Sequence, residues 1–294
     1  MSKKRTIGMV GVGTMGGGMA RNLIKAGYAV TVCDLDPDKI KTLVDLGATE
    51  SATPRQTGSE NEITLVSLPT SGTFIKVAET EDGLLEGAGD SRIVVDAGTT
   101  SAPETRRLAT AFRERNAFLV DAPVSGGGRG ADDGSLAVMV GGDIEAVARC
   151  QDVFDVIGGN VAHLGPSGAG QVGKAVNQIA MGVADAAFLE AMLVGVKGGL
   201  DPKQIWNVLS TAGAAHTSFE RAAKAVIAGT AANRDCKIRE IPYFIEEARD
   251  QGYNLPLTEA FDAFCSNAEK TITDPLGIPT ASFWNELVSR EREG

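Results

Sequence analysis

Short apolar runs alternate with longer amphipathic segments in the first half of the chain. Thr6–Val10 is a run of β-compatible residues, and Met19, Leu23 and Ile24 follow it at helical spacing. Similar short runs predict strands at residues 29–33, 63–67, 92–96, 118–122 and 136–140. Strands that alternate with helices are typical of a parallel sheet covered by helices. We therefore predict an α/β domain in this half.

The pattern changes after Gly165-Pro166-Ser167, where the strand-like runs stop. Residues 170–196 contain no proline and carry a long face of small apolar side chains, which predicts a helix that connects two domains. Later segments also predict helices, at residues 202–210, 218–228, 239–251 and 256–270. The predicted organisation is an α/β domain over residues 1–165, a linking helix over 166–196 and an all-α domain over 197–294.

A glycine-rich turn follows the first predicted strand directly. Its residues are Gly11, Val12, Gly13, Thr14, Met15 and Gly16. A bare GxGxxG pattern is weak, but here a second predicted strand ends at Asp34, 23 residues after Gly11, which completes a dinucleotide-binding unit. Gly13 would let the backbone approach a pyrophosphate, and Asp34 would accept a hydrogen bond from a ribose 2′-hydroxyl. A 2′-phosphate would be repelled there, so NAD is favoured over NADP. The alternative is a structural turn without a nucleotide.

Two other loops follow predicted strands and are candidates to line the nicotinamide half of such a site. Leu68 and Pro69 follow one strand, and Thr99 follows the next. Ligands of open parallel sheets bind at the carboxyl ends of the strands. Ordinary strand-to-helix loops are the alternative interpretation.

The stretch Pro123–Gly130 combines glycines with a hydroxyl and a guanidinium. Backbone amides of Gly126 and Gly127, with Ser125 and Arg129 beside them, form a possible anion site. A flexible hairpin connection is the alternative.

A second candidate for chemistry is the segment Gly168–Gln178. If it opens a helix, Lys174, Asn177 and Gln178 lie at i, i+3 and i+4, so an amine and two amides share one face. That set could exchange a proton and orient a substrate. Taken alone, the segment is more typical of a solvated helix surface that carries one lysine.

Charge and composition narrow the function. There are 28 Lys and Arg against 38 Asp and Glu, a formal net charge of −10, and no basic run beyond residues 3–5, which argues against nucleic-acid binding. Four cysteines lie far apart and there are two histidines, so no metal site is expected. We find no secretory signal and no run of about 18 apolar residues, which predicts a cytoplasmic protein without a membrane partner. A small acidic substrate would need a local cation.

Three spaced motifs occur in order along the chain and resemble those of the β-hydroxyacid dehydrogenase family, which includes 3-hydroxyisobutyrate dehydrogenase and tartronate semialdehyde reductase. They are Gly11–Gly16 with Met19-Ala20 and Asn22-Leu23, Asp121–Gly127, and Gly168-Ala169-Gly170 with Lys174 and Asn177. The likeness runs nearly end to end. It implies a Rossmann-type dinucleotide-binding domain, a long linking helix and an all-α domain, assembled as a homodimer or homotetramer.

The resemblance also implies roles for individual residues. Lys174 matches the catalytic lysine, which exchanges a proton with the substrate oxygen. Ser125, Gly126 and Gly127 match the loop that holds the substrate carboxylate. Asn177 and Gln178 match the amides that orient the substrate, although many members have a second asparagine in place of Gln178.

The chain departs from the family at Arg239-Glu240, where members usually have Lys-Asp. Arg239 keeps the positive charge with a different geometry, and it is a candidate for cofactor contact. Whether Arg239 and Arg129 face the cofactor or the substrate stays open at this point, and Arg129 could instead pair with Asp132 or Asp133.

The expected activity is NAD-dependent interconversion of a small β-hydroxy acid, or a sulfonate analogue, and its semialdehyde or keto form. A free lysine has a pKa of about 10.4, so we expect burial or Arg239 to lower the pKa of Lys174. Alternatives are a catalytically silent NAD(P)-binding module that serves regulation or interaction, and an NADP-preferring reductase of the same superfamily, such as an imine or phosphogluconate-type reductase.

Overall fold

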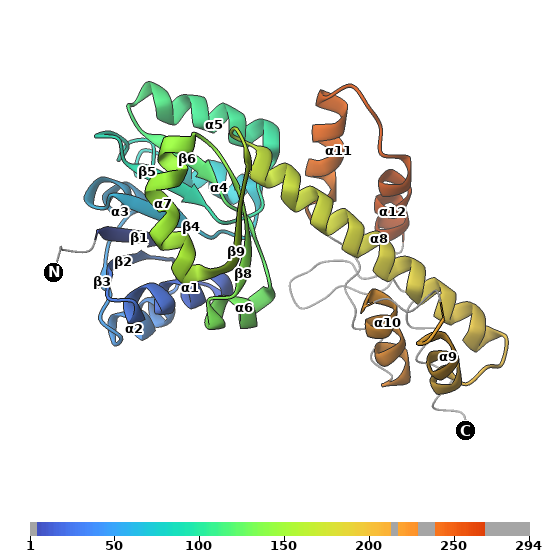
Figure 1. Cartoon of the computed structure of the whole chain (residues 1–294). Coiled ribbons are helices and arrows are strands. Elements are labelled where there is room, and N and C mark those ends of the chain that lie inside the picture. Colours follow the sequence, from blue (N-terminus) through green and yellow to red (C-terminus); the bar gives the residue numbers. More distant parts are fainter. Residues whose placement is uncertain (1–4, 213–216, 229–238, 268–294) are drawn as a thin grey trace. The chain divides into compact units, whose positions relative to one another are not determined.

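A computed structural model of the chain describes residues 5–212, 217–228 and 239–267 (Figure 1). It divides into two compact units, Met1–Lys174 and Ala175–Gly294, and each is described by itself. The predicted domain bounds at residues 165 and 196 stay predictions. The boundary between the units falls inside one long helix, α8 (Ala169–Lys197), directly after Lys174.

The first unit is built on one sheet. Its strands are β1 (Thr6–Val10), β2 (Ala29–Cys33), β3 (Thr49–Glu50), β4 (Ile63–Val66), β5 (Ile93–Asp96), β6 (Phe118–Asp121), β7 (Val124–Ser125), β8 (Leu136–Gly141) and β9 (Gly158–Gly165). Its helices before α8 are α1 (Thr14–Lys25), α2 (Pro37–Val44), α3 (Pro54–Glu60), α4 (Ser71–Glu79), α5 (Ala102–Glu114), α6 (Gly127–Asp133) and α7 (Ile144–Ile157).

The strands lie in the order β3-β2-β1-β4-β5-β6-β8-β7, with β9 paired to β8. The pairs from β3 to β6 are parallel, whereas β8 is antiparallel to both β6 and β7. The order therefore reverses between β1 and β4, which is the switch point where open sheets of this kind bind ligands. The predicted α/β fold with a Rossmann-type sheet is confirmed.

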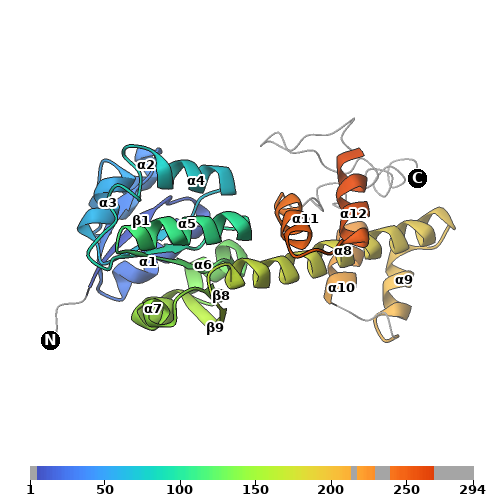
Figure 2. The same cartoon turned by 90° about the horizontal axis from the view of Figure 1, so that it is seen from above.

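Side chains of the central strands alternate between two apolar clusters, one on each face of the sheet. Met9, Leu65 and Val95 belong to the cluster that α1 and α7 cover. Val10, Val66 and Val94 belong to the cluster that α4 and α5 cover (Figure 2). Both faces are buried, so the strands read in sequence as continuous apolar runs and not as an alternating pattern.

Several helices begin where the sequence supplies a capping side chain. Asp36 accepts from the backbone N–H groups of Asp38 and Lys39 and is followed by Pro37, so α2 begins there. Thr53 and Thr70 cap α3 and α4 in the same way. Asp36 and Thr70 therefore end the loops after β2 and β4, and both loops carry candidate site residues.

The described part of the second unit is helical. After α8 it contains α9 (Pro202–Leu209), α10 (Thr217–Ile227), α11 (Ile241–Asp250) and α12 (Pro256–Asn267). Leu189, Met192, Phe219, Ile245 and Phe261 form its buried apolar cluster. The predicted all-α character and the four later helices are confirmed over these residues, and the predicted extension of the last helix to residue 270 lies outside the described residues.

Helix α8 is long and apolar enough over Ala169–Val196 to cross a membrane, and its most apolar 18 residues have a mean hydropathy of 1.8. A core helix passes the same test. Leu189 and Met192 on α8 are fully buried in the helical cluster, and Asp185 forms an ion pair with Arg221 at 3.3 Å. These residues pack in the helical cluster, whereas only 25% of the apolar window is buried. The predicted localisation stays a prediction.

Candidate functional site

The glycine turn after β1 has the geometry of a phosphate cradle. Gly11 has a φ of +85°, and a Cβ on Gly16 would lie 1.9 Å from the Gly11 carbonyl oxygen, so both positions require glycine. A Cβ on Gly13 would meet no described atom within 4 Å, which leaves the backbone open to approach. Gly13 is also the N-cap of α1, and no described side chain caps that end. The free N–H groups at this helix N-terminus fit a pyrophosphate.

Asp34 lies at the end of β2, against this turn. Its carboxylate accepts from the N–H of Val12 at 2.6 Å and from the N–H of Asp36 at 3.0 Å. Each oxygen keeps a second lone pair for a ribose hydroxyl. The side chain is half-buried, and the neighbouring Leu35 is fully exposed.

The loops after β4 and β5 meet the glycine turn at the same edge of the sheet. A Cβ on Gly11 would lie 3.0 Å from Cδ2 of Leu68, and a Cβ on Gly98 would lie 3.2 Å from the Leu68 carbonyl oxygen. Pro69 is exposed and Thr99 is half-buried. The structure thus brings Leu68, Pro69 and Thr99 to the switch point, and their contact with a cofactor stays a prediction.

The glycine-rich stretch after β6 forms a short strand and a short helix, so it differs from the plain hairpin considered above. Strand β7 pairs with β8, Gly126 and Gly127 have φ values of +140° and +63°, and α6 begins at Gly127. A Cβ on Gly128 would lie 2.9 Å from Cγ2 of Thr14, and a Cβ on Gly18 would lie 2.8 Å from the Cβ of Ala131. Helix α6 therefore packs directly on α1 (Figure 1), and the possible anion loop adjoins the dinucleotide turn.

Arg129 lies on α6 with its side chain 94% exposed and forms an ion pair with Asp133 at 3.4 Å. This contact is the pairing that the sequence left as an alternative. A role of Arg129 in substrate binding stays a prediction.

Lys174 lies at the other side of the same loop. Its side chain is buried, with 8% relative exposure, and Nζ donates to the carbonyl oxygen of Val124 at 2.7 Å. Val124 directly precedes Ser125. The structure therefore brings the amine to the Ser125–Gly127 loop, although 50 residues separate the two in sequence.

Asn177, Gln178 and Arg239 belong to the second unit. Gln178 Nε2 lies 3.5 Å from Oε2 of Glu240, and the buried Gln178 Oε1 has no hydrogen-bond partner among the described residues. Arg239 is exposed just before α11. Their proposed roles toward substrate and cofactor stay predictions.

The structure contains a buried polar cluster at the first turn of α8 that the sequence analysis did not predict. Asp96 at the end of β5 accepts from Thr100 Oγ1 at 2.6 Å and from the Gly98 N–H at 2.9 Å. Asp121, its neighbour in register on β6, accepts from the N–H groups of Gly168 and Gln171 at 2.8 and 3.1 Å. Burial raises the pKa of Asp96 to about 7 and also raises the pKa of Asp121. The sequence did carry a signal for this cluster, because an aspartate ends each of the two apolar runs that form β5 and β6.

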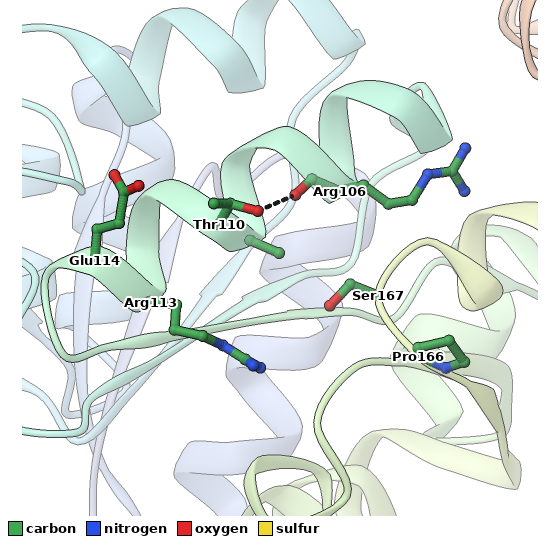
Figure 3. A pocket seen from close by; sticks show the side chains of 7 residues that line it. Arg106, Thr110, Arg113, Glu114, Pro166 and Ser167 are labelled. Carbon is green, nitrogen blue, oxygen red and sulfur yellow. Dashed lines mark hydrogen bonds between the residues drawn. The ribbon is translucent and has the colours of Figure 1, made fainter. Parts of the chain in front are cut away.

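A separate hollow of about 500 Å³ lies along α5 and the turn before α8 (Figure 3). Its lining residues are Arg106, Ala109, Thr110, Arg113, Glu114, Pro166 and Ser167, and none of the predicted site residues is among them. Arg113 also lies 3.5 Å from Asp143. The candidate site is therefore the loop region around Lys174 and not this hollow. Within the described ranges no group of three or more His, Cys, Asp or Glu could hold a metal ion.

Comparison with known proteins places the chain in a family. Residues 6–165 match the NAD-binding domain of 6-phosphogluconate dehydrogenase, and residues 168–276 match the NAD-binding domain of NADP-dependent 3-hydroxyisobutyrate dehydrogenase. An NAD-dependent L-serine dehydrogenase of Pseudomonas aeruginosa is 35% identical over 216 residues, which is 74% of this chain and 72% of that protein. A 3-hydroxyisobutyrate dehydrogenase of the same organism is 38% identical over 203 residues, covering 69% and 68%.

Among solved structures, a 3-hydroxyisobutyrate dehydrogenase of Salmonella typhimurium superposes with a TM-score of 0.79 at 24% identity, covering 98% of this chain and 100% of that one. This likeness supports the fold. The two family matches and the relatives above 30% identity confirm the resemblance that the sequence motifs indicated: the chain belongs to the β-hydroxyacid dehydrogenase family and carries that family's NAD-binding domain.

Proposed function

We propose that this protein is an NAD-dependent dehydrogenase of a small β-hydroxy acid, in which Lys174 is the general acid and base. The observation that carries the proposal is the buried Lys174 amine, held by the Val124 carbonyl at 2.7 Å beside the Ser125–Gly127 loop. The family membership supports oxidation of a CH–OH group. The silent-module alternative needs no such amine at an anion loop.

The residues divide the chemistry among them. Ser125 and the backbone amides of Gly126 and Gly127 bind the substrate carboxylate. Lys174 accepts the hydroxyl proton at Nζ when the alcohol is oxidised and returns it when the carbonyl is reduced. Bound NAD supplies the hydride acceptor. The Gly11–Gly16 turn holds the pyrophosphate and Asp34 holds the adenosine ribose, which supports NAD over NADP.

The substrate is one of a class. A panel of 3-hydroxy acids, sulfonate analogues and serine-like acids tests which of these the enzyme oxidises. The increase in NADH absorbance measures the rate with each compound. Turnover of none of them, with NAD still bound, would favour the silent module. The homodimeric or homotetrameric state and the acidic substrate stay part of this proposal.

The test of the amine is Lys174→Ala. We expect kcat to fall about 10²- to 10⁴-fold, because a positioned general acid and base contributes that much, while the Kd for NAD stays within a few-fold. The control is Lys224→Ala, an exposed lysine on α10 whose partner is Glu220. If Lys174→Ala keeps most of kcat, the amine does not carry the proton transfer.

A further inference from the structure

We infer that Gln171 is a positioning residue that joins the loop after β5 to the first turn of α8 and thereby holds the Lys174 amine in place; this rests on the proposed function of Lys174. Nothing in the family resemblance pointed to this residue. The inference is carried by the buried hydrogen bonds that the Gln171 side chain makes with the loop after β5 and that its backbone N–H makes with Asp121 on β6.

The side chain of Gln171 is bound entirely to the loop after β5. Oε1 accepts from the Thr100 N–H at 3.0 Å, and Nε2 donates to the Gly98 carbonyl oxygen at 3.1 Å and lies 3.4 Å from Asp96 Oδ2. The residue is 2% exposed, so water does not replace these partners. Loss of the amide would leave a backbone donor and a backbone acceptor of the loop unpaired in the interior, which is costly.

The backbone of Gln171 is bound to the neighbouring strand. Its N–H and that of Gly168 donate to the two oxygens of the fully buried Asp121. A carboxylate at this place satisfies N–H groups at the helix N-terminus and interacts favourably with the helix dipole. The first turn of α8 is thus fixed to β6 through Asp121 and to the β5 loop through Gln171.

Lys174 follows Gln171 by three residues and therefore lies about one turn further along the same side of α8. Its amine is fixed at the tip by Val124, which lies just beyond β6. The β5 loop carries Thr99, a predicted neighbour of the nicotinamide. Gln171 accordingly connects the support of the proton-transferring group with the support of the hydride acceptor.

This connection matters because both transfers occur on one substrate carbon and its oxygen. A displacement of about 1 Å at a reacting group can cost about 10²-fold in rate. We therefore expect that cutting the connection lowers kcat and leaves the binding of NAD, which depends on the β1 turn, nearly unchanged. A purely structural role would lower stability alone.

The matched pair of variants is Gln171→Leu and Asn61→Leu. Asn61 is also a 2% exposed amide of the first unit, and its Nδ2 donates to the Thr57 carbonyl oxygen at 2.9 Å, away from the Lys174 loop. Both variants remove a buried amide. We expect a lower Tm in both, but a fall in kcat of about 10- to 100-fold only in Gln171→Leu, with the Kd for NAD within a few-fold of the original protein.

Gln171→Glu adds a rescue that depends on pH. A protonated glutamic acid keeps one acceptor for Thr100 and one donor for Gly98, whereas an ionised one loses the donor and adds a negative charge beside Asp96 and Asp121. We expect the ratio of its kcat to that of the original protein to rise as the pH falls. A ratio that stays constant over this pH range would contradict the inference.

Hydrogen–deuterium exchange provides the readout that does not require activity. In Gln171→Leu, exchange should rise together in peptides that cover residues 97–101 and 168–175, and neither should change in Asn61→Leu. The inference is overturned if only one segment responds, or if kcat falls no further than in Asn61→Leu. If the original protein oxidises no acid in the panel, the proposed function fails, and the exchange result still decides whether Gln171 joins the two segments.

Discussion

The burial of Asp96 predicts an unusual pH dependence of the free energy of unfolding. The carboxyl group is buried at the end of β5, and burial is the largest cause that raises its pKa from 3.8 to about 7; the Thr100 hydroxyl and the Gly98 N–H oppose this, and the charge of Asp121 adds to it. In the unfolded chain the same group ionises near pH 4. The folded protein therefore holds a proton between about pH 4 and pH 7 that the unfolded chain has lost.

The sign and size follow from this difference. Because the folded state binds more protons in this window, the free energy of unfolding falls as the pH rises from about 4 through about 7. A separation of about three pH units, at about 1.4 kcal/mol each, gives about 4 kcal/mol as the cost of ionising Asp96 in the folded protein. The cost is absent below the lower pKa and complete above the higher one.

The perturbation is Asp96→Asn, which keeps the side-chain shape and an acceptor for Gly98. Urea denaturation at a series of values between about pH 5 and pH 8 should show a shallower loss of stability in the variant. The control is Asp36→Asn. Asp36 is an exposed helix cap, and its hydrogen bond with Lys39 is the largest cause that lowers its pKa. Its titration therefore changes stability only at pH values below the range measured. If Asp96→Asn and the original protein lose stability in parallel, Asp96 is ionised throughout and the reasoning is refuted.

Two further changes address the cofactor side of the site. Asp34→Asn should raise the KM for NAD by about tenfold or more and relax discrimination against NADP, since it removes a charge-assisted acceptor worth about 1.5–3 kcal/mol; the ratio of kcat/KM for the two cofactors measures this, and an original protein that already prefers NADP would contradict it. Gly18→Ala should cost about 1–3 kcal/mol and raise the KM for the acid, because its Cβ would lie 2.8 Å from Ala131 and force α6 from α1. Gly72→Ala, with no described atom within 4 Å of its Cβ, is the control, and equal effects would rule out the packing argument.

The elements that the sequence predicted are those whose burial requires a periodic or continuous pattern of apolar residues. The central strands are examples, because both of their faces are covered. Strand β9 left no such record, since most of Gly158–Gly165 is exposed. Helix α6 contains Gly127, Gly128 and Gly130, which disfavour helix, and it forms through its packing on α1.

The candidate site divides in the same way. The glycine turn and Asp34 are local in sequence, so their spacing predicted their arrangement. The approach of Lys174 to Val124 spans 50 residues, and residue spacing alone does not encode it. The family resemblance assigned substrate roles to Lys174 and to the Ser125–Gly127 loop, but it did not predict this hydrogen bond. Gln171 is a single amide in a helix, and its partners become visible only when β5 and β6 lie side by side.

The cap that Asp121 provides has a consequence for where this domain can be cut. The two N–H groups that satisfy its carboxylate follow it by 47 and 50 residues, beyond the family's domain boundary at residue 165. A fragment that stops at that boundary would leave the Asp121 carboxylate without those donors and without the turn that covers it. We therefore expect a stable fragment of this domain to extend at least to Gln171, so that the Asp121 carboxylate keeps both donors.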